Sequence, residues 1–363
     1  MTGMIPRGTR TGATWSNWAG DQRCVPAEIV EPRNRDELAE AVASAAAAGR
    51  TVSVPGSGHS FTEAAMTDGA MIRIESLCGV IDADPASGLV RVGAGTVLAD
   101  LNAALDGLGL AMENLGDIDR QTIAGAISTA THGTGAGLRN ISAQVEAIEL
   151  VLGDGSVREL GPGDPLLAAA RVGVGALGAI SAVTLRCVPA FTLHRIDRPR
   201  PIEEVLGSFF ELAASNDHFE FFVFPYTDSA LTISRNRTES DPRPRGPLRR
   251  FLSDVVLEEG LGEMMLRATR RWPALIPRST RLAANVLSQG EHIDRSHRVF
   301  SNRREIRFTE MEYAIPRSNG PEAVRRVLDL IRENRIEVAM PIECRVVAPD
   351  DALLSPSHER STT

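Results

Sequence analysis

Short apolar runs alternate with helical patterns along the first half of the chain. The helical pattern is clearest where Asn34, followed three residues later by Glu37, predicts the start of an Ala-rich helix that ends before Gly49. A second helix is predicted over 97–105. The runs expected to form strands or hairpins are 27–31, 51–54, 80–83, 89–92, 144–152, 156–160 and 179–188. Hairpins mixed among helices predict an α+β fold, because the regular βαβ order of a Rossmann domain is missing.

The pattern changes near Pro189. Beyond it, we expect an aromatic strand over 219–226 and a polar, Pro-rich stretch over 235–247. A strand over 308–315, a helix over 322–332 and a strand over 342–347 are expected to follow. A chain of 363 residues is also too long for one small hydrophobic core. We therefore expect two domains, over 15–189 and 190–363.

The net charge of the chain bears on which classes of partner it can bind. The formal net charge is −8, whereas proteins whose main partner is nucleic acid usually carry a basic face. Arginines gather in two groups, which are Arg243, Arg245, Arg249 and Arg250, and then Arg267, Arg270 and Arg271. Prolines are threaded through the first group, and a solvated surface is favoured over an anion site or a membrane-surface site.

Cysteine spacing and hydropathy bear on the compartment. The four cysteines, Cys24, Cys78, Cys187 and Cys344, form no CxxC pair, so we expect neither a zinc site nor a disulfide framework. No run of about 18 apolar residues and no N-terminal apolar leader is present. We expect a soluble, cytoplasmic protein without a metal or an integral membrane segment, and we leave contact with a membrane surface open.

A glycine-rich loop follows the strand predicted over 51–54. Its sequence, Pro-Gly-Ser-Gly-His-Ser-Phe over 55–61, places Gly56 and Gly58 where several backbone N–H groups can point to one side. Such a nest binds a pyrophosphate without a charged side chain, and His59 would lie beside the group to which that diphosphate belongs. A surface turn with an incidental histidine is an equally good interpretation of the loop alone.

Small and hydroxyl-bearing residues dominate the segment 114–135, so a flat ring can lie against its backbone. The hydroxyls available to ring edges or phosphate oxygens are those of Thr122, Ser128, Thr129 and Thr131. His132 in this company favours a cofactor wall over a purely structural role. A GxGxxG spacing occurs at 173–178, but it precedes a strand, whereas the dinucleotide fingerprint follows a strand and opens a helix. We therefore reject a Rossmann site there.

Glu343 and Arg345 lie two residues apart in the strand predicted over 342–347, so they share one face of it. A carboxylate beside a guanidinium can accept and donate hydrogen bonds to a polyol or a lactone. An exposed, salt-paired strand face is the better interpretation when spacing alone is considered.

Several motifs in a fixed order resemble those of one flavoprotein superfamily. Gly-Ser-Gly-His-Ser-Phe over 56–61, the segment 114–135 and Gly-Ala-Leu-Gly over 175–178 resemble the FAD-binding domain of the vanillyl-alcohol-oxidase superfamily. Asn17-Trp18, Glu-Met-Glu-Tyr-Ala-Ile-Pro over 310–316 and Pro-Ile-Glu-Cys-Arg over 341–345 resemble, more narrowly, the L-gulono-1,4-lactone and D-arabinono-1,4-lactone oxidases or dehydrogenases. The resemblance runs from about Trp15 to His358. It implies a two-subdomain FAD-binding domain of the PCMH type, followed by an α+β cap over the flavin.

The resemblance also implies roles for individual residues. Those implied in cofactor binding are Pro55, Gly56, Ser57, Gly58, His59, Ser60, Asp117, Thr122, Gly125, Thr129, His132 and Ile180. The loop over 55–60 would hold the pyrophosphate, and the Ile180 backbone would meet the adenine end. His59 falls where many relatives join the flavin 8α-methyl group covalently to a histidine. The implied catalytic residues are Glu343, Arg345 and Asp117, and Asp117 stands where alditol oxidases of this superfamily carry serine.

The implied reaction oxidises an aldono-1,4-lactone, gulono- or arabinono-lactone, by transfer of a hydride from an alcohol carbon to flavin N5. Arg345 would stabilise the developing alkoxide, and Glu343 would orient the hydroxyl. Electrons would then pass to oxygen, a quinone or a cytochrome. A polyol (alditol) oxidase and a nicotinamide-using reductase are alternatives.

Relatives continue beyond the residues that match 354–360 into a His-Trp-Gly-Lys motif, which this sequence does not contain. The resemblance therefore also implies a cap domain that is incomplete at its C-terminus. A family member that binds flavin but is catalytically impaired is a further alternative.

Overall fold

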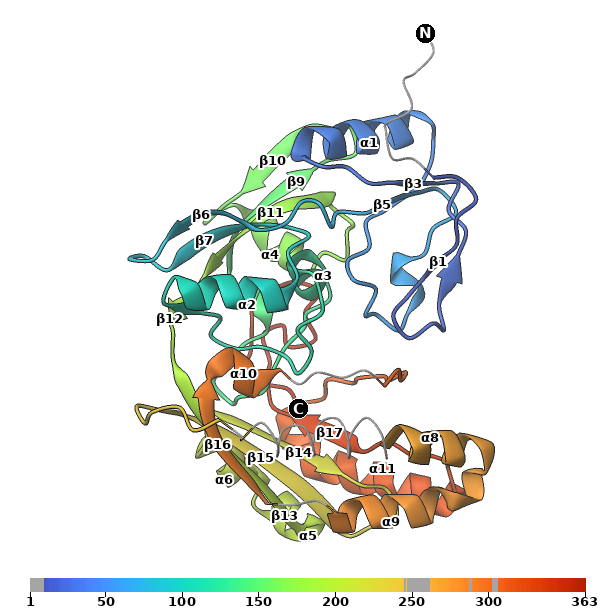
Figure 1. The fold of residues 1–363 in the computed structure, drawn as a ribbon, viewed down its shortest axis with the longest axis vertical. Helices are drawn as coiled ribbons and strands as arrows, with labels where there is room; N and C mark the ends of the chain where they lie inside the picture. Colours follow the sequence, from blue (N-terminus) through green and yellow to red (C-terminus); the bar gives the residue numbers. More distant parts are fainter. Residues whose placement is uncertain (1–9, 245, 247–261, 287–288, 302–305) are drawn as a thin grey trace.

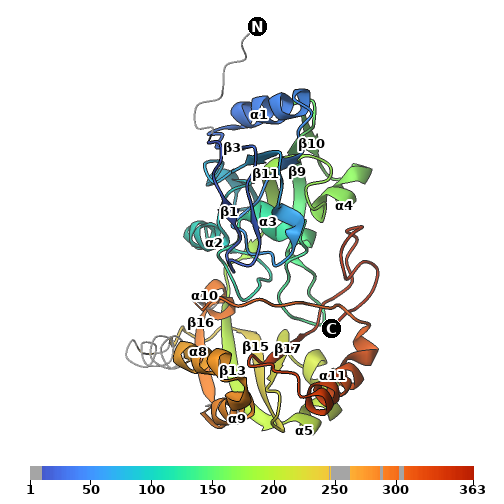
Figure 2. The same cartoon turned by 90° about the vertical axis from the view of Figure 1, so that its right-hand side faces the viewer.

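The structure is a computed structural model that describes residues 10–244, 246, 262–286, 289–301 and 306–363. The N-terminal half, up to Pro189, lies above the C-terminal half along the long axis of the molecule (Figure 1). A view turned by 90° shows the same stacking, with the C-terminal residue between the two halves (Figure 2).

Two sheets form most of the N-terminal half. A small parallel sheet has the strand order β3-β5-β4, and a five-stranded antiparallel sheet has the order β10-β9-β11-β7-β6. Their strands are β3 (Glu28–Val30), β5 (Ala70–Ile72), β4 (Val52–Ser53), β10 (Val157–Leu160), β9 (Val145–Val151), β11 (Ala179–Arg186), β7 (Leu89–Gly93) and β6 (Val80–Asp84). Two short ribbons pair β1 (Trp15–Ser16) with β2 (Arg23–Cys24) and β8 (Leu110–Ala111) with β12 (Val188–Pro189).

Four α-helices and two 3-10 turns complete the described part of this half, and one apolar cluster joins all of them except η1 to the sheets. They are α1 (Arg35–Ala47), η1 (Glu63–Ala65), α2 (Leu98–Gly107), α3 (Ile123–Ser128), η2 (Ile141–Gln144) and α4 (Pro165–Arg171). The predicted start of α1 is confirmed, because the Asn34 side chain accepts a hydrogen bond from the Glu37 backbone N–H at 2.9 Å. Both predicted hairpins are confirmed as β6-β7 and β9-β10.

One antiparallel sheet, which we call the C-terminal sheet, organises the second half. Its strands in spatial order are β16 (Gly290–Arg295), β13 (Thr192–Pro201), β15 (Ser229–Thr238), β14 (His218–Val223) and β17 (Ile342–Arg345). The helices and 3-10 turns are α5 (Ile202–Gly207), α6 (Phe209–Ala214), α8 (Gly262–Arg271), η4 (Pro273–Leu275), α9 (Ile276–Val286), α10 (Ser296–Phe300), η5 (Arg317–Asn319) and α11 (Gly320–Asn334). The predicted helix over 322–332 is therefore confirmed within α11.

The two faces of the C-terminal sheet differ in chemistry. Phe219 and Phe221 of β14 pack in one apolar cluster with residues of α5, α6 and α11, which cover that face. The alternate residue Glu220 points to the other face, and it is directly opposite Arg345 of β17 in the strand register. Arg235 of β15 lies opposite His218, on that same second face. We call this second face, which is turned toward the N-terminal half, the charged face.

Backbone and side-chain hydrogen bonds join the two halves directly after β17. The Gly135 N–H donates to the Val346 carbonyl at 2.8 Å, and the Ala348 N–H donates to the Leu138 carbonyl at 2.9 Å. The Asn140 amide donates to the buried Asp350 carboxylate at 2.9 Å. These bonds place the segment 131–140 of the N-terminal half against the end of β17.

Two expectations from the sequence are corrected. The strand predicted over 308–315 is wrong, because only Ile315, at its end, pairs through the backbone, with Thr363, and the rest of the segment spans the space between the halves through its side chains. The stretch 235–247 is not polar loop throughout, because β15 continues to Thr238 and buries Arg235. Among the predicted surface arginines, Arg243, Arg267, Arg270 and Arg271 are exposed, and Arg245, Arg249 and Arg250 lie outside the described residues. None of the helices in the described ranges is long and apolar enough to cross a membrane.

Candidate active site

The glycine-rich loop over 55–60 lies directly against the start of α3. A Cβ atom at Gly56 would come within 2.3 Å of the Thr122 Oγ1 atom, so no side chain fits there. Gly58 has a φ of 73°, and its carbonyl accepts a hydrogen bond from the Trp18 N–H at 2.8 Å. Pro55 is buried and Ser57 is exposed. The sequence therefore builds a close approach of backbone to backbone at this place.

His59 follows in the same loop and stacks on Trp18, with ring centroids 5.1 Å apart and an interplanar angle of 27°. Its Nδ1 atom is buried and finds no hydrogen-bond partner among the residues that the structure describes. Burial, and to a smaller extent the charge of Arg120, lowers the pKa of His59. The lowered pKa favours the neutral imidazole of His59, whose Nδ1 nitrogen is free of hydrogen bonds within the described chain. The carbonyl of Ser60 accepts a hydrogen bond from the Asn17 side chain at 3.0 Å, which fixes the end of the loop.

Thr122, Gly125 and Thr129 form the local frame of α3. Thr122 caps the helix by accepting from the Gly125 N–H at 3.2 Å, and the Thr129 hydroxyl donates to the Gly125 carbonyl at 3.0 Å. The Gly56 Cα atom is the next neighbour of Gly125. These residues of the predicted cofactor set thus meet the loop. Ile180 lies apart from them in β11, at an irregularity of its pairing with β9.

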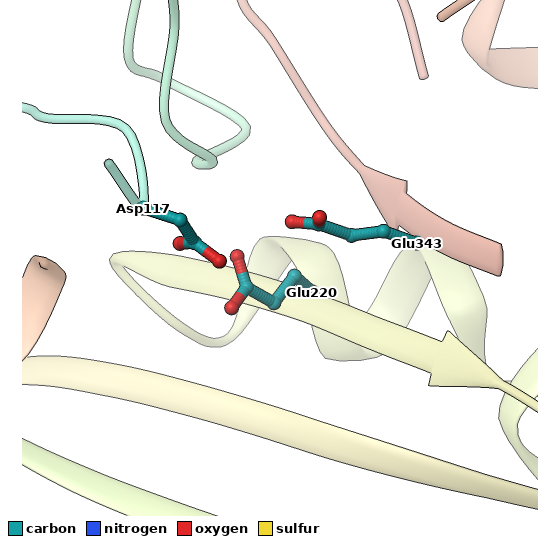
Figure 3. A group of neighbouring side chains, drawn as sticks. All are labelled: Asp117, Glu220 and Glu343. Atoms are coloured by element: carbon teal, nitrogen blue, oxygen red, sulfur yellow. The ribbon is translucent and has the colours of Figure 1, made fainter. Parts of the chain in front are cut away.

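Three carboxylates meet above the charged face. Asp117 comes from the N-terminal half, Glu220 from β14 and Glu343 from β17, and an oxygen atom of each lies within 4.8 Å of the others. Figure 3 shows the three side chains pointing toward one another from these separate segments. Asp117 and Glu343 were predicted, and the structure brings them together. Glu220 was missed.

Arg235 of β15 supplies positive charge to this group of carboxylates. Its Nη2 atom lies 2.7 Å from a Glu220 oxygen and 3.9 Å from an Asp117 oxygen. Burial by itself lowers the pKa of Arg235, but Glu220 and Asp117 outweigh burial and raise it, so the guanidinium stays charged. Arg235 was not predicted as a site residue, because it stands at the start of a polar, Pro-rich stretch that was interpreted as surface.

Arg345 forms a second ionic group with Glu312 and His132. Its guanidinium pairs with one Glu312 oxygen and donates to the His132 carbonyl at 3.1 Å, while the His132 Nε2 atom lies 2.6 Å from the other Glu312 oxygen. The Arg345 Nε atom is 3.5 Å from Glu343. Burial favours the neutral carboxyl of Glu312, but the bond from His132 and the charge of Arg345 prevail and lower its pKa. Glu312 therefore stays anionic and fixes both partners.

The sequence contained evidence of different strength for the residues that were not predicted. Glu220 is a lone acid in the run Phe-Glu-Phe-Phe, and a charge inside an apolar strand indicates a buried polar role. Glu312 and Trp18 stand inside motifs that the resemblance names, but nothing local showed which residues they touch. The arrangement as a whole offers hydrogen-bond acceptors and donors to a polyhydroxylated ligand, with the loop and α3 beside it.

Comparisons with known proteins agree on both halves. Residues 183–363 match the family model of D-arabinono-1,4-lactone oxidase, and residues 26–161 match that of an FAD binding domain. The chain is 47% identical to an L-gulono-1,4-lactone dehydrogenase of Mycobacterium tuberculosis, covering 96% of this chain and 81% of that protein. It is 32% identical to the L-gulonolactone oxidase of Bos taurus, covering 97% and 80%.

A more distant relative is the alditol oxidase of a Streptomyces species, at 30% identity over 96% of this chain and 80% of that protein. Among solved structures, the cholesterol oxidase of Brevibacterium sterolicum superposes with a TM-score of 0.78 at 18% identity, covering 96% of this chain and 76% of that one. This likeness shows the fold, which is the α+β fold with a PCMH-type FAD-binding domain that the sequence predicted.

Proposed function

Because this chain belongs to the family of FAD-dependent sugar-lactone oxidoreductases, we propose that it oxidises an aldono-1,4-lactone, such as gulono- or arabinono-1,4-lactone, at an alcohol carbon. The observation that carries the proposal is the position of the charged face. Its Glu343 and Arg345 meet Asp117 and His132, which belong to the half that matches an FAD binding domain.

The residues around the glycine-rich loop fit FAD. Gly56 packs directly against Thr122 and Gly125, which holds the loop backbone beside the start of α3, and the two glycines of the loop let its N–H groups form an anion-binding nest. The buried and unpartnered Nδ1 atom of His59 is a polar group that a bound ligand would explain. We propose that the loop over 55–60 holds the pyrophosphate and that Thr122, Gly125, Thr129 and His132 line the flavin. A covalent link through His59 and the contact of the Ile180 backbone with the adenine end belong to the same proposal.

FAD supplies the acceptor for a hydride when it is bound. The side chains of this chain then have two tasks. Glu343 accepts a hydrogen bond from the substrate hydroxyl and so orients it, and Arg345 stabilises the negative charge that develops on that oxygen. Arg345 can do this without reorganising, because Glu312 and the His132 carbonyl already hold its guanidinium in place. Asp117 adds a further acceptor for the hydroxyls of the ring.

We place the boundary between the FAD-binding and the cap domain at Pro189 and Ala190. β12 ends there and pairs with β8 of the N-terminal half, while β13 is the first strand of the C-terminal sheet. We also propose a cytoplasmic location, supported by four cysteines that are all free thiols. Oxygen, a quinone or a cytochrome is proposed as the final electron acceptor.

Anaerobic mixing tests the proposed reaction. The FAD-loaded protein is mixed with L-gulono-1,4-lactone, D-arabinono-1,4-lactone, xylitol or NADPH, and the loss of oxidised-flavin absorbance is followed. We expect a lactone to reduce the flavin fastest. Faster reduction by xylitol would assign a polyol oxidase, and bleaching by NADPH alone would assign a reductase. A flavin that none of the four reduces would indicate a protein that binds flavin without turnover.

A further inference from the structure

Arg235 crosses the boundary between the two halves. It comes from β15 in the C-terminal sheet, is 2% exposed, and reaches Asp117 of the N-terminal half with its Nη2 atom at 3.9 Å. The same Nη2 atom bonds Glu220 at 2.7 Å, and Glu220 is as deeply buried as Arg235. The Nε atom of Arg235 has no hydrogen-bond partner within the described parts of the chain, so its carboxylate contacts run through Nη2.

The charges around Arg235 explain why the contact matters. Carboxylate oxygens of Asp117, Glu220 and Glu343 lie within 4.8 Å of one another, and like charges at that spacing repel. Glu220 and Glu343 are held by the register of β14 and β17, whereas Asp117 stands in an irregular segment between β8 and α3. Of the three, Asp117 is therefore the one that repulsion can displace.

The positive charge that holds the three carboxylates together is already present in the protein. Arg235 contacts Asp117 and Glu220, and Arg345 lies 3.5 Å from Glu343. Two guanidinium groups thus compensate the negative charge of this cluster, as a bound cation does in other acidic clusters. The geometry needs no metal ion to account for the three carboxylates.

We infer that Arg235 is a positioning residue, which holds Asp117 beside Glu343 from the opposite half of the molecule, with Glu220 as its permanent counter-ion. The role in the reaction rests on the proposed function, since Asp117 and Glu343 are its proposed substrate contacts. The role as a clamp between the halves does not depend on it. The raised pKa of Arg235 agrees with a permanent charge at this place.

The test replaces the buried pair as a unit, Glu220→Met with Arg235→Met, since apolar residues of similar size usually replace a buried ion pair without loss of the fold. The matched control is Arg91→Met with Glu149→Gln. That pair lies in the five-stranded sheet of the N-terminal half, away from the charged face, with 2.8 Å between Arg91 Nη2 and a Glu149 oxygen. Both proteins are studied as full chains loaded with FAD.

The first readout is amide hydrogen exchange of the segment 112–122 without substrate. We expect exchange roughly tenfold faster than in the control variant, because Asp117 loses its hold on the C-terminal sheet. Asp117→Asn alone removes the charge attraction between this segment and Arg235 from the other side, and it should also speed exchange there. Should the paired substitution fail to fold, Asp117→Asn decides the outcome. Exchange at the control rate in the variants that fold overturns the clamp.

The second readout is a cycle in kcat/KM for the lactone. Loss of the pair should lower kcat/KM by about a hundredfold, as misplacement of a contact by about 1 Å does. In the Asp117→Asn background the same substitution should change it by less than about threefold, because Arg235 acts through Asp117. Equal losses in both backgrounds would overturn the positioning role. A wild-type protein that no lactone reduces would instead refute the proposed function, while hydrogen exchange would still test the clamp.

Discussion

The glycine-rich loop and the charged face belong to one candidate site, yet the loop presents mainly backbone atoms and the face presents side chains. The loop offers mainly backbone, since no Cβ fits at Gly56 and Gly58 adopts a left-handed conformation. The charged face offers side chains, among them Glu220, Arg235 and Arg345, from three strands. The backbone conformation of the loop is set by its own glycines, whereas the charged face depends on the pairing of β14 with β17, which is distant in the chain. The proposed cofactor end of the site is therefore more local than the proposed substrate end.

The charged face should show the largest effect on chemistry. We expect Arg345→Met to slow reduction of the flavin by lactone by about a thousandfold, because the donor to the developing alkoxide is lost. FAD content should fall far less than the rate, since the glycine-rich loop is untouched and only the support of His132 is lost on the cofactor side. Stopped-flow absorbance measures the rate. Arg325→Met, which removes a surface pair with Glu203, is the control and should be neutral. A loss below tenfold in Arg345→Met would contradict the role of this face.

The loop should show the largest effect on cofactor affinity. Gly56→Ala places a Cβ 2.3 Å from Thr122 Oγ1, and overpacking of this kind costs about 1–3 kcal/mol, or roughly 5- to 150-fold in FAD affinity. Fluorescence titration of the apoprotein with FAD checks the prediction. Gly137→Ala meets nothing within 4 Å and should bind normally. Adding Thr122→Ala to Gly56→Ala should restore part of the affinity, and no restoration would argue against the clash.

The buried His218 of the C-terminal sheet should make the stability of the protein depend on pH. Burial lowers the pKa of His218 to about 4, although its bond to the Thr134 carbonyl at 2.9 Å acts in the opposite direction. Between about pH 6.5 and pH 4 the unfolded chain binds a proton that the folded chain does not. Stability therefore falls with falling pH in this window, by about 2 kcal/mol from pH 7 to pH 5.

Urea unfolding at pH 7 and pH 5 measures this loss. His218→Gln should remove it, since an amide does not titrate. Equal pH dependence in wild type and His218→Gln would show that the loss has another origin.

The smallest effect is expected at the stacked His59. His59→Ala should release the flavin into the supernatant after acid precipitation, whereas the wild-type pellet should stay yellow. Lost stacking on Trp18 costs about 1 kcal/mol, or roughly fivefold in FAD affinity. Trp18→Phe keeps an aromatic partner and should keep the colour in the pellet. A colourless wild-type pellet would rule out the covalent link and leave FAD binding intact.

Much of the N-terminal half could be predicted from local signals. The cap at Asn34, the two hairpins and the end of the first helix before Gly49 are each decided within a few residues, and the structure has them at the predicted places. The C-terminal half was harder. The segment 308–315 has the alternation of a strand, but only its last residue finds a backbone partner, so Glu312 reaches His132 and Arg345 instead of joining a sheet. Burial of Arg235 also went against its polar, Pro-rich neighbourhood.

By itself, the sequence determined the α+β class, the glycine-rich loop with His59, and the face shared by Glu343 and Arg345, because turns, caps and alternation act between near neighbours along the chain. Only the tertiary structure decided that Asp117 meets Glu220 and Glu343, and that Arg235 lies beneath them. Register between β14, β15 and β17 and the docking of the two halves set those distances. The β14–β15 pairing joins residues close in the sequence, but the β14–β17 pairing and the docking of the two halves join residues more than a hundred positions apart, and no local pattern encodes these contacts.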